Sequence, residues 1–198
     1  FVELRNLTAT DVALFDAAFP TNRWQVRGGI DYDFPTATTL AADGRLLLVS
    51  FDPTNVVKLA SLRQRYGIAP SVPVFGPYAG KMDNSTDTVR LRKPDAPNLS
   101  GSVPYILVDE VNYRDAAPWP TGADGSGATL QRIALTQYGN DPTNWTAAAP
   151  TAGSDSGGGA PPVITAQPAN TSVVAFSPVT FAVTATGATP LSYQWQRD

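Results

Sequence analysis

The chain has 198 residues, of which 42% are hydrophobic and 16% are charged, and its formal net charge is −3. This composition is typical of a globular protein, and it lacks the dense basic patch that a nucleic-acid partner requires for neutralising its phosphates. Histidine and cysteine are both absent, which excludes disulfides, Ser-His-Asp triads and zinc sites built from Cys and His.

The first quarter of the chain is predicted to form β-strands. Within residues 30–34, Ile30, Tyr32 and Phe34 alternate with aspartates, as in a strand with one buried face. Residues 46–51 form an apolar run, which predicts a strand buried on both faces. The strands expected in this part are residues 2–6, 7–16, 24–27, 30–34 and 46–51.

One helix is expected next. Residues 52–54 offer a capping side chain and an early proline, which suit a helix start, and Gly67 is expected to end the helix. The apolar positions with near-helical spacing are Val56, Leu59, Ala60 and Leu62. The side chains expected to face water are Lys58, Arg63 and Arg65.

The chain then returns to β-structure. Residues 72–81 are interrupted by proline and glycine, which favours an edge strand or an extended loop over a central strand. Further strands are expected at residues 88–92, 103–113 and 129–135. The main apolar positions of the longest one are Ile106, Val108, Val111 and Tyr113.

The composition changes at residues 147–162, which are small and rich in Gly, Ser and Pro. Such a segment buries too little apolar surface to offset the entropy lost on ordering it. We therefore predict a β-domain at residues 1–148, a linker at 149–162 and the N-terminal part of a second β-domain at 163–198, with three or four short strands.

The order and spacing of several motifs in the first domain resemble the lamin-tail domain of large secreted bacterial proteins. The motifs are residues 2–6, 76–80, 109–113, 118–120, 124–130 and 140–145. The resemblance implies an immunoglobulin-like β-sandwich without enzymatic activity. The family normally has a strand before the Glu-Leu-x-Asn segment, and this chain starts inside that region. We therefore expect the first strand to be missing or supplied from elsewhere.

The last part of the chain is similar to the first third of a bacterial immunoglobulin-like repeat. The motifs are residues 164–168, 179–185 and 191–195. In such a repeat, Trp195 is the core tryptophan of the third strand. A complete sandwich needs about seven strands in roughly 100 residues, so we expect this second domain to be incomplete.

A calcium loop is one interpretation of residues 124–127, Asp-Gly-Ser-Gly. Calcium loops gather several oxygen ligands at fixed spacing, whereas here Asp124 stands alone and Asp115 and Asp141 are unplaced. Because Asp-Gly and Ser-Gly are turn dipeptides, a turn is the preferred interpretation.

Paired carboxylates for glycoside hydrolysis are a second interpretation, for Asp109 and Glu110. Adjacent residues of a regular strand point to opposite faces, so these two are not expected to share a site. Asp31 and Asp33 do share a face, but their apolar neighbours make it the solvent face.

A sugar-stacking platform is a third interpretation, for Trp24, Trp119 and Trp145. Tryptophan more often buries most of its area in a core or at the end of a sandwich. Trp119, between two prolines, is expected to be the most exposed of the three.

Five sequons for N-glycosylation occur, and they are interpreted as mostly incidental in a β-protein rich in Thr and Asn. Their asparagines are Asn6, Asn84, Asn98, Asn144 and Asn170.

The sequence as a whole predicts an all-β protein: an immunoglobulin-like β-sandwich of the lamin-tail type with one short helix, followed by a partial second immunoglobulin-like unit. No catalytic, cofactor-binding or metal-binding residue is assigned, no cofactor is expected, and no apolar run approaches the ~20 residues that span a bilayer.

The predicted function is that of a non-enzymatic structural or adhesive protein, extracellular or on the cell surface. Its expected partners are other copies of itself or other surface proteins, with assembly into a filament or surface layer by strand exchange at open sheet edges. The alternatives are a carbohydrate-binding accessory module of a larger secreted enzyme, with a glycan as partner, and a passive spacer.

Overall fold

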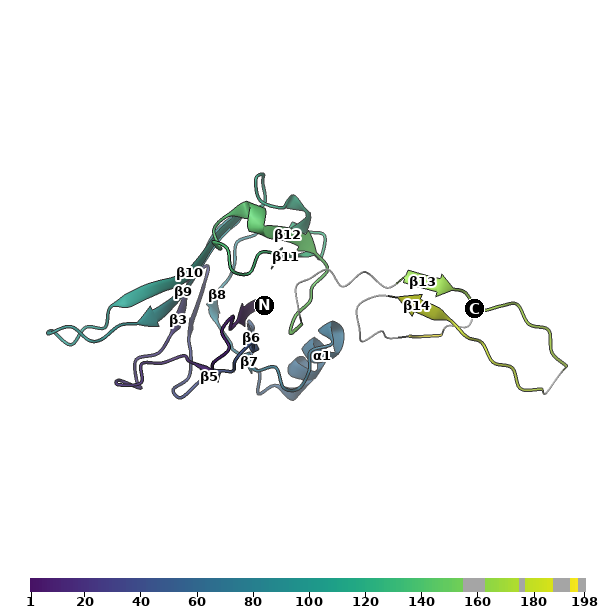
Figure 1. Cartoon of the computed structure of the whole chain (residues 1–198), viewed down its shortest axis with the longest axis horizontal. Helices are drawn as coiled ribbons and strands as arrows, with labels where there is room; N and C mark the ends of the chain where they lie inside the picture. The colour runs from purple at the N-terminus through teal and green to yellow at the C-terminus, as the bar shows by residue number, and fades with distance from the viewer. Residues whose placement is uncertain (155–162, 175–176, 187–192, 196–198) are drawn as a thin grey trace. The chain divides into compact units, whose positions relative to one another are not determined.

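The structure is a computed structural model of the chain, and it describes residues 1–154, 163–174, 177–186 and 193–195. The chain divides into two compact units, Phe1–Asp155 and Ser156–Asp198 (Figure 1). In the described residues most of the regular structure is β-strand, largely in antiparallel sheets, with a single α-helix. The predicted all-β class is therefore confirmed.

Two sheets form the body of the first unit, with five strands in the order β10-β9-β3-β4-β8 and three in the order β1-β6-β7. The five strands are β3 (Gln25–Gly28), β4 (Ile30–Asp33), β8 (Ala79–Gly80), β9 (Thr86–Pro94) and β10 (Tyr105–Arg114). The three strands are β1 (Val2–Arg5), β6 (Arg45–Leu48) and β7 (Val74–Phe75). All neighbours run antiparallel except β6 and β7, which are parallel.

Two smaller strand pairs complete the first unit. They join β2 (Val12–Ala13) to β5 (Thr39–Leu40) and β11 (Thr129–Arg132) to β12 (Trp145–Ala148). The expected strand at 7–16 is thus reduced to two residues, and β12 was not predicted, because its Trp-Thr-Ala-Ala sequence lies between a turn cluster and the small-residue segment.

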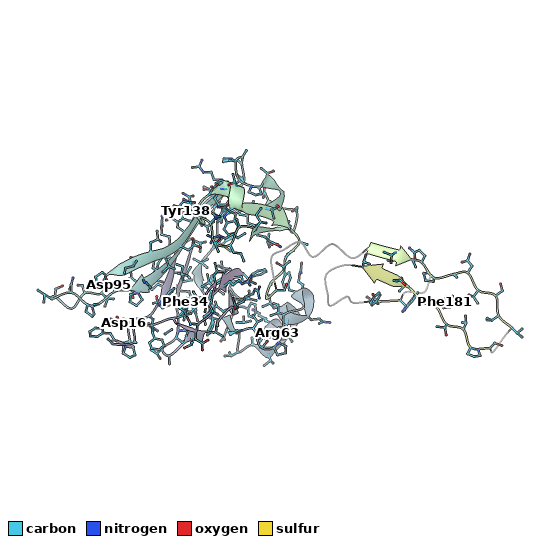
Figure 2. The ribbon with its side chains drawn as sticks, viewed as in Figure 1. Asp16, Phe34, Arg63, Asp95, Tyr138 and Phe181 are labelled. Carbon is cyan, nitrogen blue, oxygen red and sulfur yellow. The ribbon has the colours of Figure 1, made fainter. Side chains whose placement is uncertain are left out.

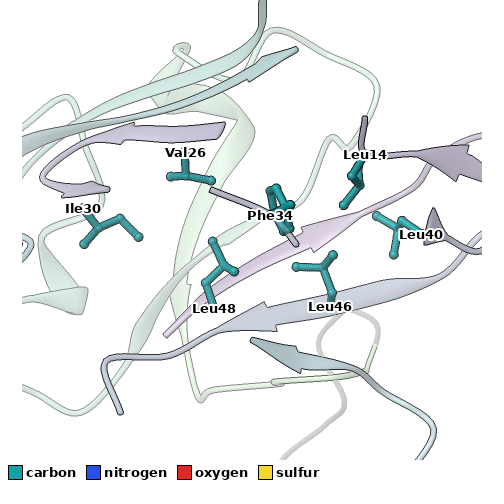
Figure 3. Packing of buried hydrophobic residues seen from close by; sticks show 7 residues of the cluster. All are labelled: Leu14, Val26, Ile30, Phe34, Leu40, Leu46 and Leu48. Atoms are coloured by element: carbon teal, nitrogen blue, oxygen red, sulfur yellow. The ribbon is translucent and has the colours of Figure 1, made fainter. Parts of the chain in front are cut away.

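The main core lies between the two sheets (Figure 3). Alternation works here as predicted: Ile30 on β4 and Phe34 just after it are fully buried, and Tyr32 packs against the same cluster. The smaller sheet contributes Leu46 and Leu48 of β6 from the opposite side. Because these side chains leave water completely, each contributes about 1.5–3 kcal/mol of hydrophobic stabilisation.

A second cluster covers the other face of the smaller sheet. Leu47, between Leu46 and Leu48, is buried against Ile68 and Ala152. Consecutive strand residues point to opposite faces, so β6 must be apolar on both. The prediction of a strand buried on both faces is confirmed.

The helix α1 spans Val56–Tyr66. Gly67 ends it in the left-handed conformation, as predicted, with φ 65°, which glycine adopts without steric cost. The N-cap is Asn55 and not Asp52, since the Asn55 side chain accepts a hydrogen bond from the Lys58 backbone N–H, whereas Asp52 binds its own turn at Thr54.

The faces of α1 differ in part from the sequence expectation. Val56, one of the apolar positions with near-helical spacing, is 74% exposed. Arg63 does not simply face water: its guanidinium donates hydrogen bonds to the carbonyls of Ala69 and Val72. These bonds attach the helix to the segment that leads into β7.

Part of the predicted linker belongs to the first unit. Ala152 is 2% exposed within the second cluster, and the Gly153 N–H donates to Glu3 Oε2 at 2.6 Å. Small residues fit here because they fill a narrow gap beside Ile68, which composition alone does not reveal. Residues 155–162 of the predicted linker lie outside the described residues.

The second unit contains one described strand pair, β13 (Val163–Ala166) with β14 (Thr184–Thr186). One of the short strands expected in this unit was residues 171–176; of these, 171–174 have no strand assignment and 175–176 lie outside the described residues. Trp195 is 60% exposed, so its expected role as a core tryptophan is not met. In the described part of this unit this strand pair has no second sheet packed against it, and an isolated two-stranded sheet is marginally stable.

Candidate functional site

The aspartates of the calcium-loop interpretation lie in separate turns. Asp124 Oδ1 accepts a hydrogen bond from Asn84 Nδ2 at 2.5 Å. Asp141 accepts from the Thr143 backbone N–H at 2.9 Å and from its hydroxyl at 2.8 Å, and these bonds lower the pKa of Asp141. Among the described residues, no three His, Cys, Asp or Glu side chains are placed to hold a metal ion together.

The adjacent carboxylates Asp109 and Glu110 bind different arginines. Glu110 Oε2 accepts from Arg90 Nε on β9 at 2.5 Å, whereas Asp109 Oδ2 accepts from Arg132 Nη1 on β11. Glu110 therefore attaches β10 to β9, and Asp109 attaches it to β11. The two carboxylates do not converge on a cleft. Asp31 and Asp33 of β4 are exposed.

The tryptophans do not form an exposed platform. Trp119, expected to be the most exposed, is only 5% exposed and packs against Trp145 with ring centroids 6.1 Å apart. The Trp145 indole N–H donates to the Gly139 carbonyl at 2.7 Å, and Trp24 packs on the main core. Trp119 is buried because Trp145 of β12, which follows it in the chain, packs against its ring.

One sequon asparagine is a buried structural residue. Asn6 is 5% exposed, and its Nδ2 lies 2.8 Å from the Thr10 carbonyl, 2.9 Å from that of Ala41 and 3.2 Å from that of Leu40. Its Oδ1 accepts from the Thr8 backbone N–H and hydroxyl. Among the other sequon asparagines, Asn84, Asn98 and Asn170 are exposed and Asn144 is half-buried.

A cleft of about 360 Å³ lies between residues 39–45 and residues 69–73. Arg45 lines it, with Nε 3.5 Å from Glu3 Oε1, and Gly153 closes one side. The nearby carboxylate balances the charge of this arginine, and small side chains and backbone line much of the rest.

The strongest candidate for an interaction site is the outer edge of β10. This strand ends the five-stranded sheet, and no described strand pairs with its outer side. Ile106, Leu107 and Val108 are 42%, 52% and 44% exposed. Three consecutive apolar residues are exposed because the register passes from Leu107↔Arg92 to Asp109↔Leu91. This β-bulge leaves Val108 without a partner on β9 and breaks the alternation.

The C-terminal half of this edge is covered. The Asn112 backbone N–H donates to Asn140 Oδ1 at 2.8 Å, and the Glu110 N–H donates to Asp109 Oδ1 at 3.0 Å. The loop at Gly139 approaches Asp109 so closely that a Cβ on Gly139 would lie 2.3 Å from its Oδ1. In the described part of the chain, residues 105–108 of β10 have no such cover on this side.

Two other sheet edges, β7 and β8, carry protective features. The edge strands β7 and β8 have two residues each, and Pro73, Gly76 and Pro77 interrupt the chain around them. Short edge strands flanked by proline are poor templates for another strand. Residues 105–108 themselves carry neither a charge nor a proline, and Pro104 precedes them.

Further exposed apolar side chains lie beside the covered half of β10. Ile133 and Tyr138 are 56% and 66% exposed, and their loop is tied to β10 through Arg132 and Asp109. We call Ile106, Leu107, Val108, Ile133 and Tyr138 the β10 edge patch. Figure 2 shows Tyr138 near the β11–β12 end of β10, and Asp95 on the projecting β9–β10 hairpin.

Charges are arranged unevenly along this edge. Arg92 of β9 is paired with Leu107, and its guanidinium lies 5.2 Å from the centre of the Tyr105 ring. Asp109 and Glu110 follow Val108 on β10. Arg132 and Arg90 already balance the charges of these two carboxylates.

No protein-family model, curated protein sequence or solved structure matches this chain. The sequence placed β10 and its apolar residues but did not single out the patch. The run Ile106-Leu107-Val108 inside an otherwise alternating strand is the signal that could have revealed it. No helix in the described part of the chain has the length and hydropathy needed for crossing a bilayer.

Proposed function

We propose that this chain is a non-enzymatic structural or adhesive protein, extracellular or on the cell surface, that acts through protein–protein contacts made at sheet edges. The observation that carries the proposal is the open, uncharged outer edge of β10 with three exposed apolar side chains. An open strand edge presents unpaired N–H and C=O groups, which pair readily with a strand from another chain.

Self-assembly into a filament or surface layer requires at least two contacts per copy. The first unit offers the β10 edge patch. The second unit has several exposed apolar side chains and no Asp, Glu, Lys or Arg between Asp155 and Arg197. Uncharged strands of this kind lack the gatekeeper charges that oppose strand pairing and exchange. The exposed side chains there include Val174, Phe181 and Tyr193.

The structure does not support the carbohydrate-binding alternative. It depended on exposed tryptophans, and Trp119 is buried against Trp145. No glycan partner is therefore proposed. The extracellular setting follows the resemblance to the lamin-tail domain.

Sedimentation of the whole chain over a wide concentration range tests the proposal. We expect the average mass to rise with concentration, because edge pairing is a bimolecular equilibrium. A chain that stays monomeric up to millimolar concentration refutes self-assembly. Circular dichroism on the same samples checks that the chain is folded.

A further inference from the structure

We propose that Asn98, in the loop of the β9–β10 hairpin, is a site of N-linked glycosylation, at which a glycan is attached to the side-chain amide nitrogen. The inference goes beyond the proposed function, and it does not depend on contacts made at sheet edges. It requires that the chain meets an oligosaccharyltransferase, in keeping with the extracellular setting proposed above.

The chemistry of this modification defines what the acceptor must offer. The donor is a glycan carried on a lipid pyrophosphate, and the acceptor is the Nδ2 of an asparagine in an Asn-x-Ser or Asn-x-Thr triplet without proline in the middle. A bond forms between Nδ2 and the anomeric carbon of the first sugar, and the bond from that carbon to the pyrophosphate oxygen breaks. The lipid pyrophosphate leaves, and the nitrogen loses one proton to a base of the transferase. The acceptor nitrogen must therefore be accessible and free of other partners.

The turn around Asn98 meets these requirements. The Asn98 Oδ1 accepts hydrogen bonds from the Ser100 backbone N–H at 3.0 Å, the Ser100 hydroxyl at 2.6 Å and the Ser102 N–H at 2.9 Å. These bonds hold the amide oxygen against the turn and place the hydroxyl of the triplet on the acceptor amide itself. Asn98 and Leu99 are exposed, and among the described residues the Asn98 Nδ2 has no hydrogen-bond partner.

The hairpin makes this turn accessible to an enzyme. The last paired residues are Pro94 of β9 and Tyr105 of β10, and residues 95–104 form the loop beyond them. The hairpin projects beyond β3 in Figure 1, and Figure 2 labels Asp95 at the start of its loop. Exposed loop tips are the segments that enzymes reach and that tolerate added groups. A glycan at Asn98 therefore displaces no packed part of the first unit.

The other three sequons of the first unit have no free amide nitrogen. Asn6 is 5% exposed, and three backbone carbonyls surround its Nδ2. The Asn84 Nδ2 donates to Asp124, and the Asn144 Nδ2 donates to the Tyr138 carbonyl at 2.9 Å. Transfer to any of these asparagines would first have to break a hydrogen bond, and transfer to Asn6 would also have to open a buried turn.

The sequon of the second unit differs in a different way. Asn170 is exposed, but the Thr171 hydroxyl donates to the Ala169 carbonyl at 3.4 Å. Within the described residues, the Ser172 hydroxyl has no hydrogen bond to the Asn170 amide. Asn98 is thus the described sequon that combines exposure, a free Nδ2 and a hydroxyl held on its own amide.

Transfer of a glycan to the folded chain tests the proposal. The whole chain, purified from a host without a transferase, is incubated with a single-subunit oligosaccharyltransferase that accepts Asn-x-Ser and with a lipid-pyrophosphate-linked oligosaccharide. Intact-mass spectrometry counts the glycans, and glycopeptide sequencing locates them. We expect one glycan per chain, on Asn98.

Two variants remove different parts of the acceptor. Asn98→Gln removes the acceptor asparagine, and Ser100→Ala removes the hydroxyl but keeps Asn98 and both N–H bonds to its Oδ1. We expect each to lower the yield of glycosylated chain by at least about tenfold, equivalent to about 1.4 kcal/mol. The matched control is Asn84→Gln, in an exposed sequon whose amide is already paired, and its yield should equal that of the natural chain. Circular dichroism checks that all three variants are folded.

Three results would overturn the proposal. They are no added mass on the folded natural chain, a glycan placed on Asn170 or another sequon and not on Asn98, and undiminished transfer to both Asn98→Gln and Ser100→Ala. None of these results involves association between chains. The proposed function is therefore judged separately, by the sedimentation experiment.

Discussion

At the residue scale, Asn6 does more than its place in a sequon indicates. Its amide lies within hydrogen-bond distance of the carbonyls of Thr10, Leu40 and Ala41 and accepts two bonds from Thr8. It therefore joins the end of β1 to the turn between β5 and β6. Buried polar side chains persist where their hydrogen bonds are satisfied.

We predict that Asn6→Ala lowers the free energy of unfolding by about 2–4 kcal/mol, because it leaves several backbone groups without their partner in a buried place. Urea unfolding followed by circular dichroism measures this. Asn84→Ala, which removes one surface hydrogen bond to Asp124, is the control, and its loss should stay below about 1 kcal/mol. Equal losses in the two variants would contradict the assigned role of Asn6.

At the scale of elements, the β11–β12 pair acts as a cover over one end of β10. Trp119 packs beneath it against Trp145, and Arg132 of β11 binds Asp109 of β10. The Arg132 guanidinium also lies 6.0 Å from the centre of the Trp145 ring, within the range of a cation–π interaction. Ring packing and an ion pair thus fix the hairpin to the sheet.

We predict that Trp119→Ala destabilises the protein by about 3–5 kcal/mol, the usual cost of removing a buried tryptophan. Its effect should appear as a lower urea midpoint and faster amide exchange in β11 and β12. The control is Tyr138→Ala, an aromatic residue nearby that is 66% exposed, which should change stability by no more than about 0.5 kcal/mol. A normal midpoint for Trp119→Ala would contradict the burial of this ring.

At the scale of the whole molecule, four shifted pKa values predict how the stability of the fold depends on pH. The Thr54 backbone N–H and hydroxyl lower the pKa of Asp52, the Ser85 hydroxyl and backbone N–H lower that of Asp83, and Thr143 lowers that of Asp141. Burial, followed by the charges of Asp87 and Asp83, raises the pKa of Tyr113 to about 12.

The directions of these pKa shifts predict that stability is constant over a middle pH range and falls at both acidic and alkaline pH. A carboxyl group whose pKa is lower in the folded state stabilises the fold at pH values above its ordinary pKa. That contribution is lost as the pH falls through the lowered pKa. The raised pKa of Tyr113 stabilises the fold fully below 10.0 and loses that contribution as the pH rises toward about 12. Urea midpoints measured from about pH 2 to about pH 12 should therefore fall at both ends.

Tyr113→Phe is the control for the alkaline limit. Titration of tyrosinate absorbance should show a group that ionises near 12 in the natural chain and disappears in this variant. The decrease in the urea midpoint between pH 10.0 and about pH 12 should also be smaller in Tyr113→Phe than in the natural chain. Unchanged behaviour in the variant would assign the alkaline limit to other groups.

Local sequence determined those features that depend on period and turn chemistry. Alternation identified the buried face of β4, the apolar run identified β6 as buried on both faces, and Gly67 marked the end of α1. The absence of His and Cys also excluded several classes of catalytic and metal site before any fold was known. These inferences held because side-chain spacing and backbone preference act over a few residues.

Tertiary structure alone decided what covers each side chain. Trp119 is buried by a hairpin that follows it in the chain, Asn6 is buried by a turn about 35 residues away, and Ala152 fills a gap beside Ile68. The β10 edge patch exists because a bulge exposes three apolar residues where no described strand pairs and the Gly139 loop stops short. Burial and exposure depend on contacts between distant segments, so composition and periodicity indicate a side chain's character but not its neighbours.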